Sequence, residues 1–119
     1  MNYKILLLFF CLFTLPVVAQ ESDAYKNALK TFQENFNAQN IDAVYDLYSA
    51  DMQEAMTKEG VTRFVKGCHE QFGNLKNVTY QSTTDDGINS YNAEFDKITL
   101  VMELMLTDDG KIASIQFQE

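Results

Sequence analysis

The chain has 119 residues, with nine basic and 17 acidic side chains and a formal net charge of −8 at pH 7. This length suits one domain with a modest core. An acidic excess of this size repels nucleic acid and anionic membrane surfaces, so neither is an expected partner.

The first 19 residues are typical of an export signal. Lys4 provides a positive start, residues 5–15 form an apolar run, and small residues precede a cleavage site after Ala19. The apolar run is shorter than the roughly 20 residues that a membrane span needs. We therefore predict a signal peptide over residues 1–19 and an exported protein, periplasmic or secreted, that is not held at a membrane after cleavage.

The expected mature chain, residues 20–119, forms a single domain. Loss of Lys4 leaves eight basic against 17 acidic side chains, a net charge of −9. Cys68 is then the one remaining cysteine, so the domain relies on packing, or on pairing between chains. An uncleaved anchor and lipidation at Cys11 are the alternatives that would keep the protein at a membrane.

Helical periodicity fills the domain up to Gly73. Apolar residues spaced three and four apart predict a helix over residues 23–38, and Asn40 is suited to cap a second helix. A short helical piece is expected to end near Met56. Thr57 is then suited to cap a further helix, which Gly73 ends.

Strand-like alternation fills the remainder of the domain. We expect strands over residues 75–83, around 91–95, over 97–107 and around 112–117, separated by turns rich in aspartate, glycine and lysine. Helices followed by a meander predict an α+β fold, in which the N-terminal helices pack on one face of a curved four-stranded antiparallel sheet.

The third expected strand, "KITLVMELMLT", contains one acid among apolar residues. Period-two alternation separates an aliphatic face, which should meet the helices, from a mixed face. The aliphatic face holds Ile98, Leu100, Met102, Leu104 and Leu106. The mixed face holds Thr99, Val101, Glu103 and Met105. We interpret the mixed face as the interface of a homodimer, and cover by the first helix or the C-terminal residues is the alternative.

Three short segments carry a resemblance to a known family. These are "YSADM" at residues 48–52, "NAEFDK" at 92–97 and "DGKI" at 109–112. They resemble an uncharacterised family of exported bacterial domains in the nuclear transport factor 2-like (cystatin-like) superfamily, whose members stand alone or ahead of serine hydrolase domains. The resemblance implies a cone of helices wrapped by a curved sheet, and it carries over no catalytic residue.

A cone of this kind has an interior in which a small apolar ligand can bind. The side chains that we expect to line it are Phe32, Tyr45, Tyr48, Phe64, Tyr91, Leu100 and Met102. The tyrosines have a second interpretation, in which they close the edge of a filled core with their hydroxyls in water.

Cys68 and His69 are the one candidate for thiol–imidazole chemistry. Adjacent helical residues point about 100° apart, so the two side chains should not meet. Cys68 falls on the apolar stripe and His69 toward the polar side, which favours an inert thiol over a reactive or pairing one. One histidine beside one cysteine does not make a tetrahedral site, so we expect no metal and no cofactor.

The leading hypothesis is a small exported non-enzymatic domain that binds a ligand or a protein partner, with homodimerisation through the outer sheet face. The first alternative is an isomerase or lyase that moves protons with a carboxylate inside the cone, for which Asp42, Asp46 and Glu103 are the available acids. The second alternative, drawn from the resemblance, is an accessory module for a separately encoded hydrolase.

Overall fold

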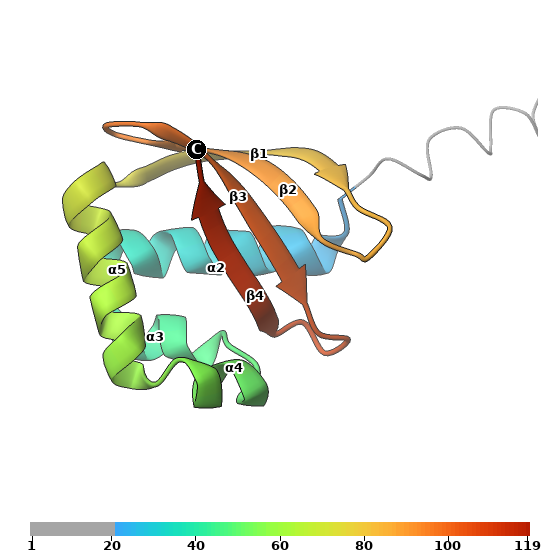
Figure 1. Cartoon of the computed structure of the whole chain (residues 1–119), viewed down its shortest axis with the longest axis horizontal. Helices are drawn as coiled ribbons and strands as arrows, with labels where there is room; N and C mark the ends of the chain where they lie inside the picture. Colours follow the sequence, from blue (N-terminus) through green and yellow to red (C-terminus); the bar gives the residue numbers. More distant parts are fainter. Residues whose placement is uncertain (1–20) are drawn as a thin grey trace, which may run out of the picture.

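A computed structural model describes residues 21–119, so the predicted signal peptide lies outside the described residues. Four helices precede four strands along this part of the chain (Figure 1). The helices are α2 (Asp23–Ala38), α3 (Ile41–Asp46), α4 (Ala50–Ala55) and α5 (Lys58–Phe72). The strands are β1 (Leu75–Thr83), β2 (Asn89–Phe95), β3 (Thr99–Leu106) and β4 (Ile112–Gln118). The predicted α+β class is confirmed.

Side-chain caps begin the helices where the sequence places them. Asn40 accepts a hydrogen bond from the Ala43 amide at 3.3 Å, and Thr57 accepts one from the Gly60 amide at 3.3 Å. Each cap satisfies an amide that has no carbonyl partner within the helix. No helix within residues 21–119 is long and apolar enough to cross a membrane.

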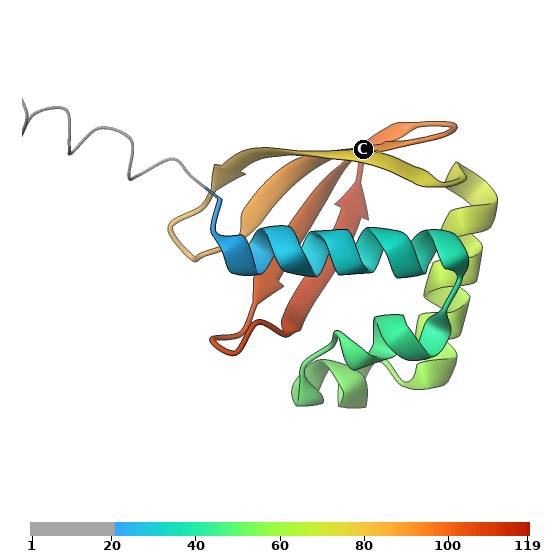
Figure 2. The same cartoon turned by 180° about the vertical axis from the view of Figure 1, so that it is seen from behind.

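The strands form one antiparallel sheet in the order β1-β2-β3-β4, which confirms the predicted four-stranded meander. Figure 2 shows α2 lying across one face of this sheet, the inner face. On β3, Leu100, Met102 and Leu104 point to the inner face and are 4%, 0% and 0% exposed. The prediction from period-two alternation that these side chains face the helices is therefore confirmed.

Ile98 is an exception to the predicted aliphatic face. It is 37% exposed, and β3 begins only after it, at Thr99. The Ile98 carbonyl accepts the Phe95 amide at 2.8 Å, which closes the hairpin between β2 and β3. Ile98 thus belongs to the turn, although the alternation of the sequence predicted it as part of the strand.

Phenylalanine rings fill the space between the helices and the sheet. Phe32 and Phe36 of α2 are fully buried, with ring centroids 5.6 Å apart. Phe95 of β2 lies 5.9 Å from Phe36 and 5.4 Å from Phe117 of β4. These edge-to-face and stacked contacts join both layers into one core.

Two amide side chains of α2 join the helix to the start of β1. The Asn37 side chain accepts the Leu75 amide at 2.7 Å and donates to the Leu75 carbonyl at 2.9 Å. Gln33 donates to the carbonyls of Leu75 and Lys76, at 2.8 and 3.0 Å. The carboxamide of Asn37 thus pairs with the backbone of β1 as a neighbouring strand would.

Candidate functional site

Of the residues expected to line a ligand pocket, Tyr48 lines a surface depression, and the others pack in the core or against it. Phe32, Tyr91 and Met102 are fully buried in the core, and Leu100 is 4% exposed. Phe64 is partly buried and stacks on Phe117 with ring centroids 6.0 Å apart. These side chains pack against one another or against other rings, so the interior is filled where the pocket was expected.

Tyr45 lies apart from the other predicted lining residues. Its ring is partly buried on α3, and the Lys58 ammonium lies 5.3 Å from the ring centroid. Lys58 also forms an ion pair with Asp42 at 3.0 Å. Tyr45 therefore contributes to an exposed contact between α3 and α5 rather than to an interior site.

Tyr48 is buried with an unpaired hydroxyl. The residue is 2% exposed, and its hydroxyl has no hydrogen-bond partner within the described part of the chain. Its backbone forms an isolated bridge with Ile112 at the start of β4. Burial, with a smaller effect from Cys68, raises the pKa of Tyr48 to about 12. The hydroxyl therefore stays protonated at neutral pH.

We expect Tyr48→Phe to raise the free energy of unfolding by about 1 kcal/mol, because a buried hydroxyl without a partner costs about 1–3 kcal/mol of desolvation. The wild-type phenol ionises near pH 10 when unfolded but only near 12 when folded. The folded state therefore holds an extra proton in this window, and stability falls as pH rises by about 1.4 kcal/mol per pH unit for one proton.

Urea unfolding of both proteins from about pH 8 to about pH 12 measures this difference. Tyr91 remains in both proteins, and burial raises its pKa as well, so a residual alkaline loss is common to them. In the Tyr48→Phe protein, the loss of stability at alkaline pH should be smaller by the contribution of one proton. A Tyr48→Phe protein that is less stable than the wild type at neutral pH would contradict the unpaired hydroxyl.

A chain of polar side chains lies at the end of the sheet nearest the start of α2. Tyr91 donates to a Glu21 carboxylate oxygen at 2.7 Å and accepts from the Asn89 amide at 3.0 Å. Asn89 in turn accepts from the Thr83 hydroxyl at 2.7 Å, and Thr83 lies 2.6 Å from the Tyr80 hydroxyl. We call Tyr80, Thr83, Asn89 and Tyr91 the polar chain.

The hydrogen bonds of the polar chain share one direction. Thr83 gives its proton to Asn89, so it accepts the proton of Tyr80. Asn89 is 4% exposed, and both ends of its amide have a partner. Every donor thus points toward the Glu21 carboxylate, and such ordered bonds polarise and strengthen one another.

Of the residues in and beside the polar chain, the sequence analysis named Tyr91 but not Asn89 or Glu21. Period-two alternation places Asn89 on the same inward face of β2 as Tyr91, and this was an available signal. Glu21 lies 70 residues from Tyr91 along the chain, and no local pattern predicts that contact.

The predicted interface residues lie on the outer sheet face, opposite α2. Thr99 is exposed, and Val101, Glu103 and Met105 are half-buried. Asn92 and Gln118 lie beside Val101 on the neighbouring strands, and the serine and amide residues Ser90 and Gln116 flank Glu103. Val101 and Met105 thus lie on either side of Glu103, with uncharged polar residues on the neighbouring strands, and α2 covers the other face of the sheet (Figure 2).

The three acids considered for proton transfer lie outside the filled interior. Asp42 is exposed and paired with Lys58, and Asp46 is exposed at the end of α3. Glu103 is half-buried on the outer sheet face. Asn89 is the buried polar side chain of the described residues, and it cannot exchange protons as a carboxylate does.

Cys68 and His69 do not form a dyad. Cys68 is half-buried, and burial raises the pKa of its thiol, which opposes formation of the thiolate. The ring of His69 packs 5.9 Å from that of Phe36, and its Nε2 lies 2.7 Å from the Asn74 side-chain oxygen. His69 therefore lies at the edge of the core, with its Nε2 beside the exposed Asn74. Residues 21–119 contain no cluster of three or more His, Cys, Asp or Glu side chains suited to a metal ion.

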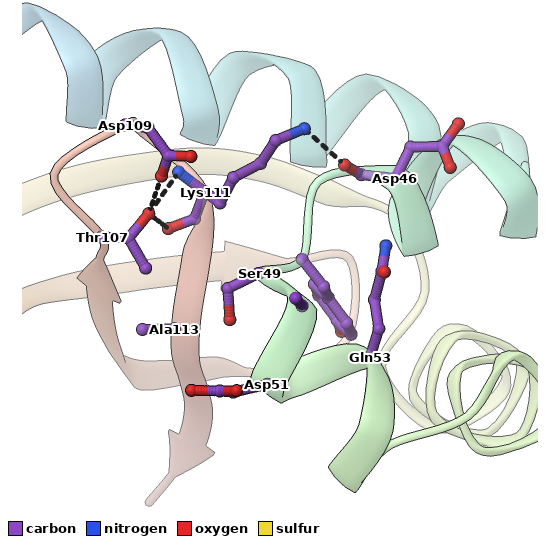
Figure 3. Close-up of a pocket in the computed structure, with 10 residues that line it drawn as sticks. Asp46, Ser49, Asp51, Gln53, Thr107, Asp109, Lys111 and Ala113 are labelled. Atoms are coloured by element: carbon purple, nitrogen blue, oxygen red, sulfur yellow. Dashed lines mark hydrogen bonds between the residues drawn. The ribbon is translucent and has the colours of Figure 1, made fainter.

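A surface depression with a volume of about 860 Å³ lies between α4 and the turn that joins β3 to β4 (Figure 3). Lys111 reaches across it and donates to the Asp46 carbonyl at 2.9 Å. Thr107 donates to Asp109, and this hydrogen bond lowers the pKa of Asp109. The depression is wide open, and its charged groups are exposed, so these contacts stabilise the turn.

These features define a small α+β domain with a filled aromatic core, a polar chain at one end and a sheet face that the described helices leave uncovered. A family described as a protein of unknown function (DUF3887) matches residues 30–115, which is most of the chain. The chain belongs to this family. No curated protein and no solved structure matches it.

Proposed function

We propose that the protein is a small exported, non-enzymatic interaction domain that pairs with a second copy of itself through the outer face of its sheet. The observation that carries the proposal is the outer face (Figure 1), which none of the described helices covers and on which uncharged polar residues flank Val101 and Glu103. Charge-poor surfaces with central apolar residues are typical of protein interfaces. The helices followed by a meander also support a nuclear transport factor 2-like relationship.

Glu103 is the charge that limits this pairing. On the outer face Glu94 is compensated by Lys76 at 3.8 Å and by Asn77 at 3.1 Å. Within the described strands Glu103 has no such ion pair, and it lies next to Val101 and Met105 on β3. A two-fold interface brings the same residue of both copies to one surface, so the two Glu103 carboxylates repel each other there.

Sedimentation equilibrium over a range of protein concentrations tests the pairing. We expect a monomer–dimer equilibrium for the wild type. Glu103→Gln should tighten it by about tenfold, because like charges across an interface cost up to several kcal/mol. Val101→Asp should abolish the dimer by adding a second acid beside the first.

Asn27→Asp provides a matched control, since it adds the same charge at an exposed position of α2. It should leave the dimerisation constant unchanged. A wild-type protein that stays monomeric at every concentration, or a Val101→Asp protein that dimerises as well as the control, would rule out the sheet interface.

A further inference from the structure

The carboxylate of Glu21 is bound by a side chain that lies far from it in the sequence. A carboxylate from another polypeptide can therefore occupy the same position. Glu21 directly precedes Ser22, the N-cap of α2, and lies outside every helix and strand. Its carboxylate accepts the Tyr91 hydroxyl at 2.7 Å, and Asn89 supports that hydroxyl from the other side. Burial raises the pKa of Tyr91, so the phenol remains a donor. The site therefore already binds a carboxylate, supplied by the chain itself.

Lysines line a depression that Glu21 also lines. Glu21 lies in a depression of about 290 Å³ between α2 and β1, whose charged wall consists of Lys26, Lys30 and Lys76. We call this depression the lysine groove. Lys26 and Lys30 thus line one groove of an acidic protein, whereas the Lys76 ammonium pairs with Glu94 at 3.8 Å. Within residues 21–119, Lys26 and Lys30 have no ion-pair partner, so their charge is available to an acidic ligand.

The lysine groove also has an apolar floor and an open strand edge. Leu29 is 7% exposed, and Val78 packs against the core from β1. β1 is an outer strand of the sheet, and the side chains of Gln33 and Asn37 occupy its edge only at Leu75 and Lys76. An unpaired strand edge is where an extended peptide adds by backbone hydrogen bonds.

We propose that the lysine groove binds an extended acidic segment of a partner polypeptide, whose glutamate takes the place of Glu21 on the Tyr91 hydroxyl. Glu21 is then an internal competitor that occupies the site until such a segment displaces it. The inference rests on the proposed role of the protein as a binding domain, but it concerns a different surface from the outer sheet face.

Exchange of the two carboxylates is compatible with the contacts in the structure. Among the described contacts, the Glu21 side chain forms one hydrogen bond, so its departure breaks one bond and the incoming glutamate restores it. The lysines add attraction that a neutral side chain lacks. A charge-assisted hydrogen bond is roughly twice as strong as a neutral one, so the site should prefer glutamate to glutamine.

Two blocked tripeptides, acetyl-Gln-Glu-Ser-amide and acetyl-Gln-Gln-Ser-amide, test this preference by NMR titration. The protein carries Glu21→Ala, which empties the site, and the reporter is the side-chain amide of Asn89. We expect the glutamate peptide to shift this signal and to bind about tenfold more tightly than the glutamine peptide. The wild type should bind the glutamate peptide more weakly than Glu21→Ala does, because its own carboxylate competes.

Two further variants distinguish the contribution of the Tyr91 hydroxyl to peptide binding from that of the lysine groove. Adding Tyr91→Phe to Glu21→Ala should remove the preference for glutamate. The exposed double substitution Lys26→Gln/Lys30→Gln, also with Glu21→Ala, should weaken binding and reduce its dependence on salt. Because both lysines are exposed, this variant should keep its fold.

Equal affinity for the two peptides, or no shift of the Asn89 signal up to about 10 mM peptide, would overturn the proposal. Sedimentation of the same samples keeps this result distinct from the proposed pairing. The dimer can form without peptide binding, and the peptide can bind a monomer, so failure of one does not imply failure of the other.

Discussion

Leu104→Ala should lower the free energy of unfolding by about 2–5 kcal/mol, the usual cost of emptying a fully buried leucine site. Leu104 is 0% exposed and points from β3 into the core, opposite Ile115 of β4 and Asn89 of β2. Rigid neighbours close on both sides, so the cavity cannot collapse easily. Urea unfolding at neutral pH measures the loss as a lower midpoint with an unchanged slope.

Glu103→Gln is the natural comparison, because it changes the adjacent residue on the opposite face of the same strand. It keeps the size of the side chain and removes a half-buried charge without an ion pair. We expect a change within about 0.5 kcal/mol, measured at a protein concentration where the wild type is monomeric. A large loss for Glu103→Gln with a small one for Leu104→Ala would mean that the strand faces are reversed.

Gly73→Ala should cost about 2–4 kcal/mol, for two reasons that add. The backbone of Gly73 has φ 86° and ψ −158°, a region that is almost exclusive to glycine and costs other residues about 1–3 kcal/mol. An added Cβ would also lie 2.6 Å from the Asp96 Cβ, so one of the two must move. Asp96 accepts the Asn74 amide at 2.9 Å, and its displacement would strain that bond as well.

Gly67→Ala serves as the control for the glycine substitution. Gly67 lies within α5, and a Cβ there would meet no atom within 4 Å. Alanine should stabilise the helix there by about 0.5–1 kcal/mol. Thermal unfolding of the two variants should therefore shift the midpoint in opposite directions. If Gly67→Ala lost as much stability as Gly73→Ala, the backbone conformation of Gly73 could not be the cause of the effect there.

Most of the helix and strand boundaries could be predicted because local chemistry sets them. Asn40 and Thr57 cap helices, and Gly73 ends one, through contacts with residues only a few positions away. The facing of β3 followed from the two-residue period of a strand and the need for an apolar inner face. Ile98 was misplaced because the hairpin turn, and not the alternation, decides where the strand begins.

The candidate site was less predictable because it depends on contacts between distant segments. Tyr45 and Tyr48 lie three residues apart near α3, yet one is surface-exposed in part and the other is buried. The rotation of a six-residue helix on its neighbours decides this difference, and its sequence carries too few turns to define a face. The bond between Glu21 and Tyr91 depends on the placement of α2 against the sheet.

The pairing of Asn37 with both backbone groups of Leu75 has a consequence for how the domain opens. α2 and the sheet are joined by hydrogen bonds at the first residue of β1. Separation of the helices from the sheet therefore breaks these bonds and exposes the start of β1. Local unfolding normally occurs in regions that have few such hydrogen bonds. At this junction the helical and sheet halves should instead unfold together, as a single cooperative unit.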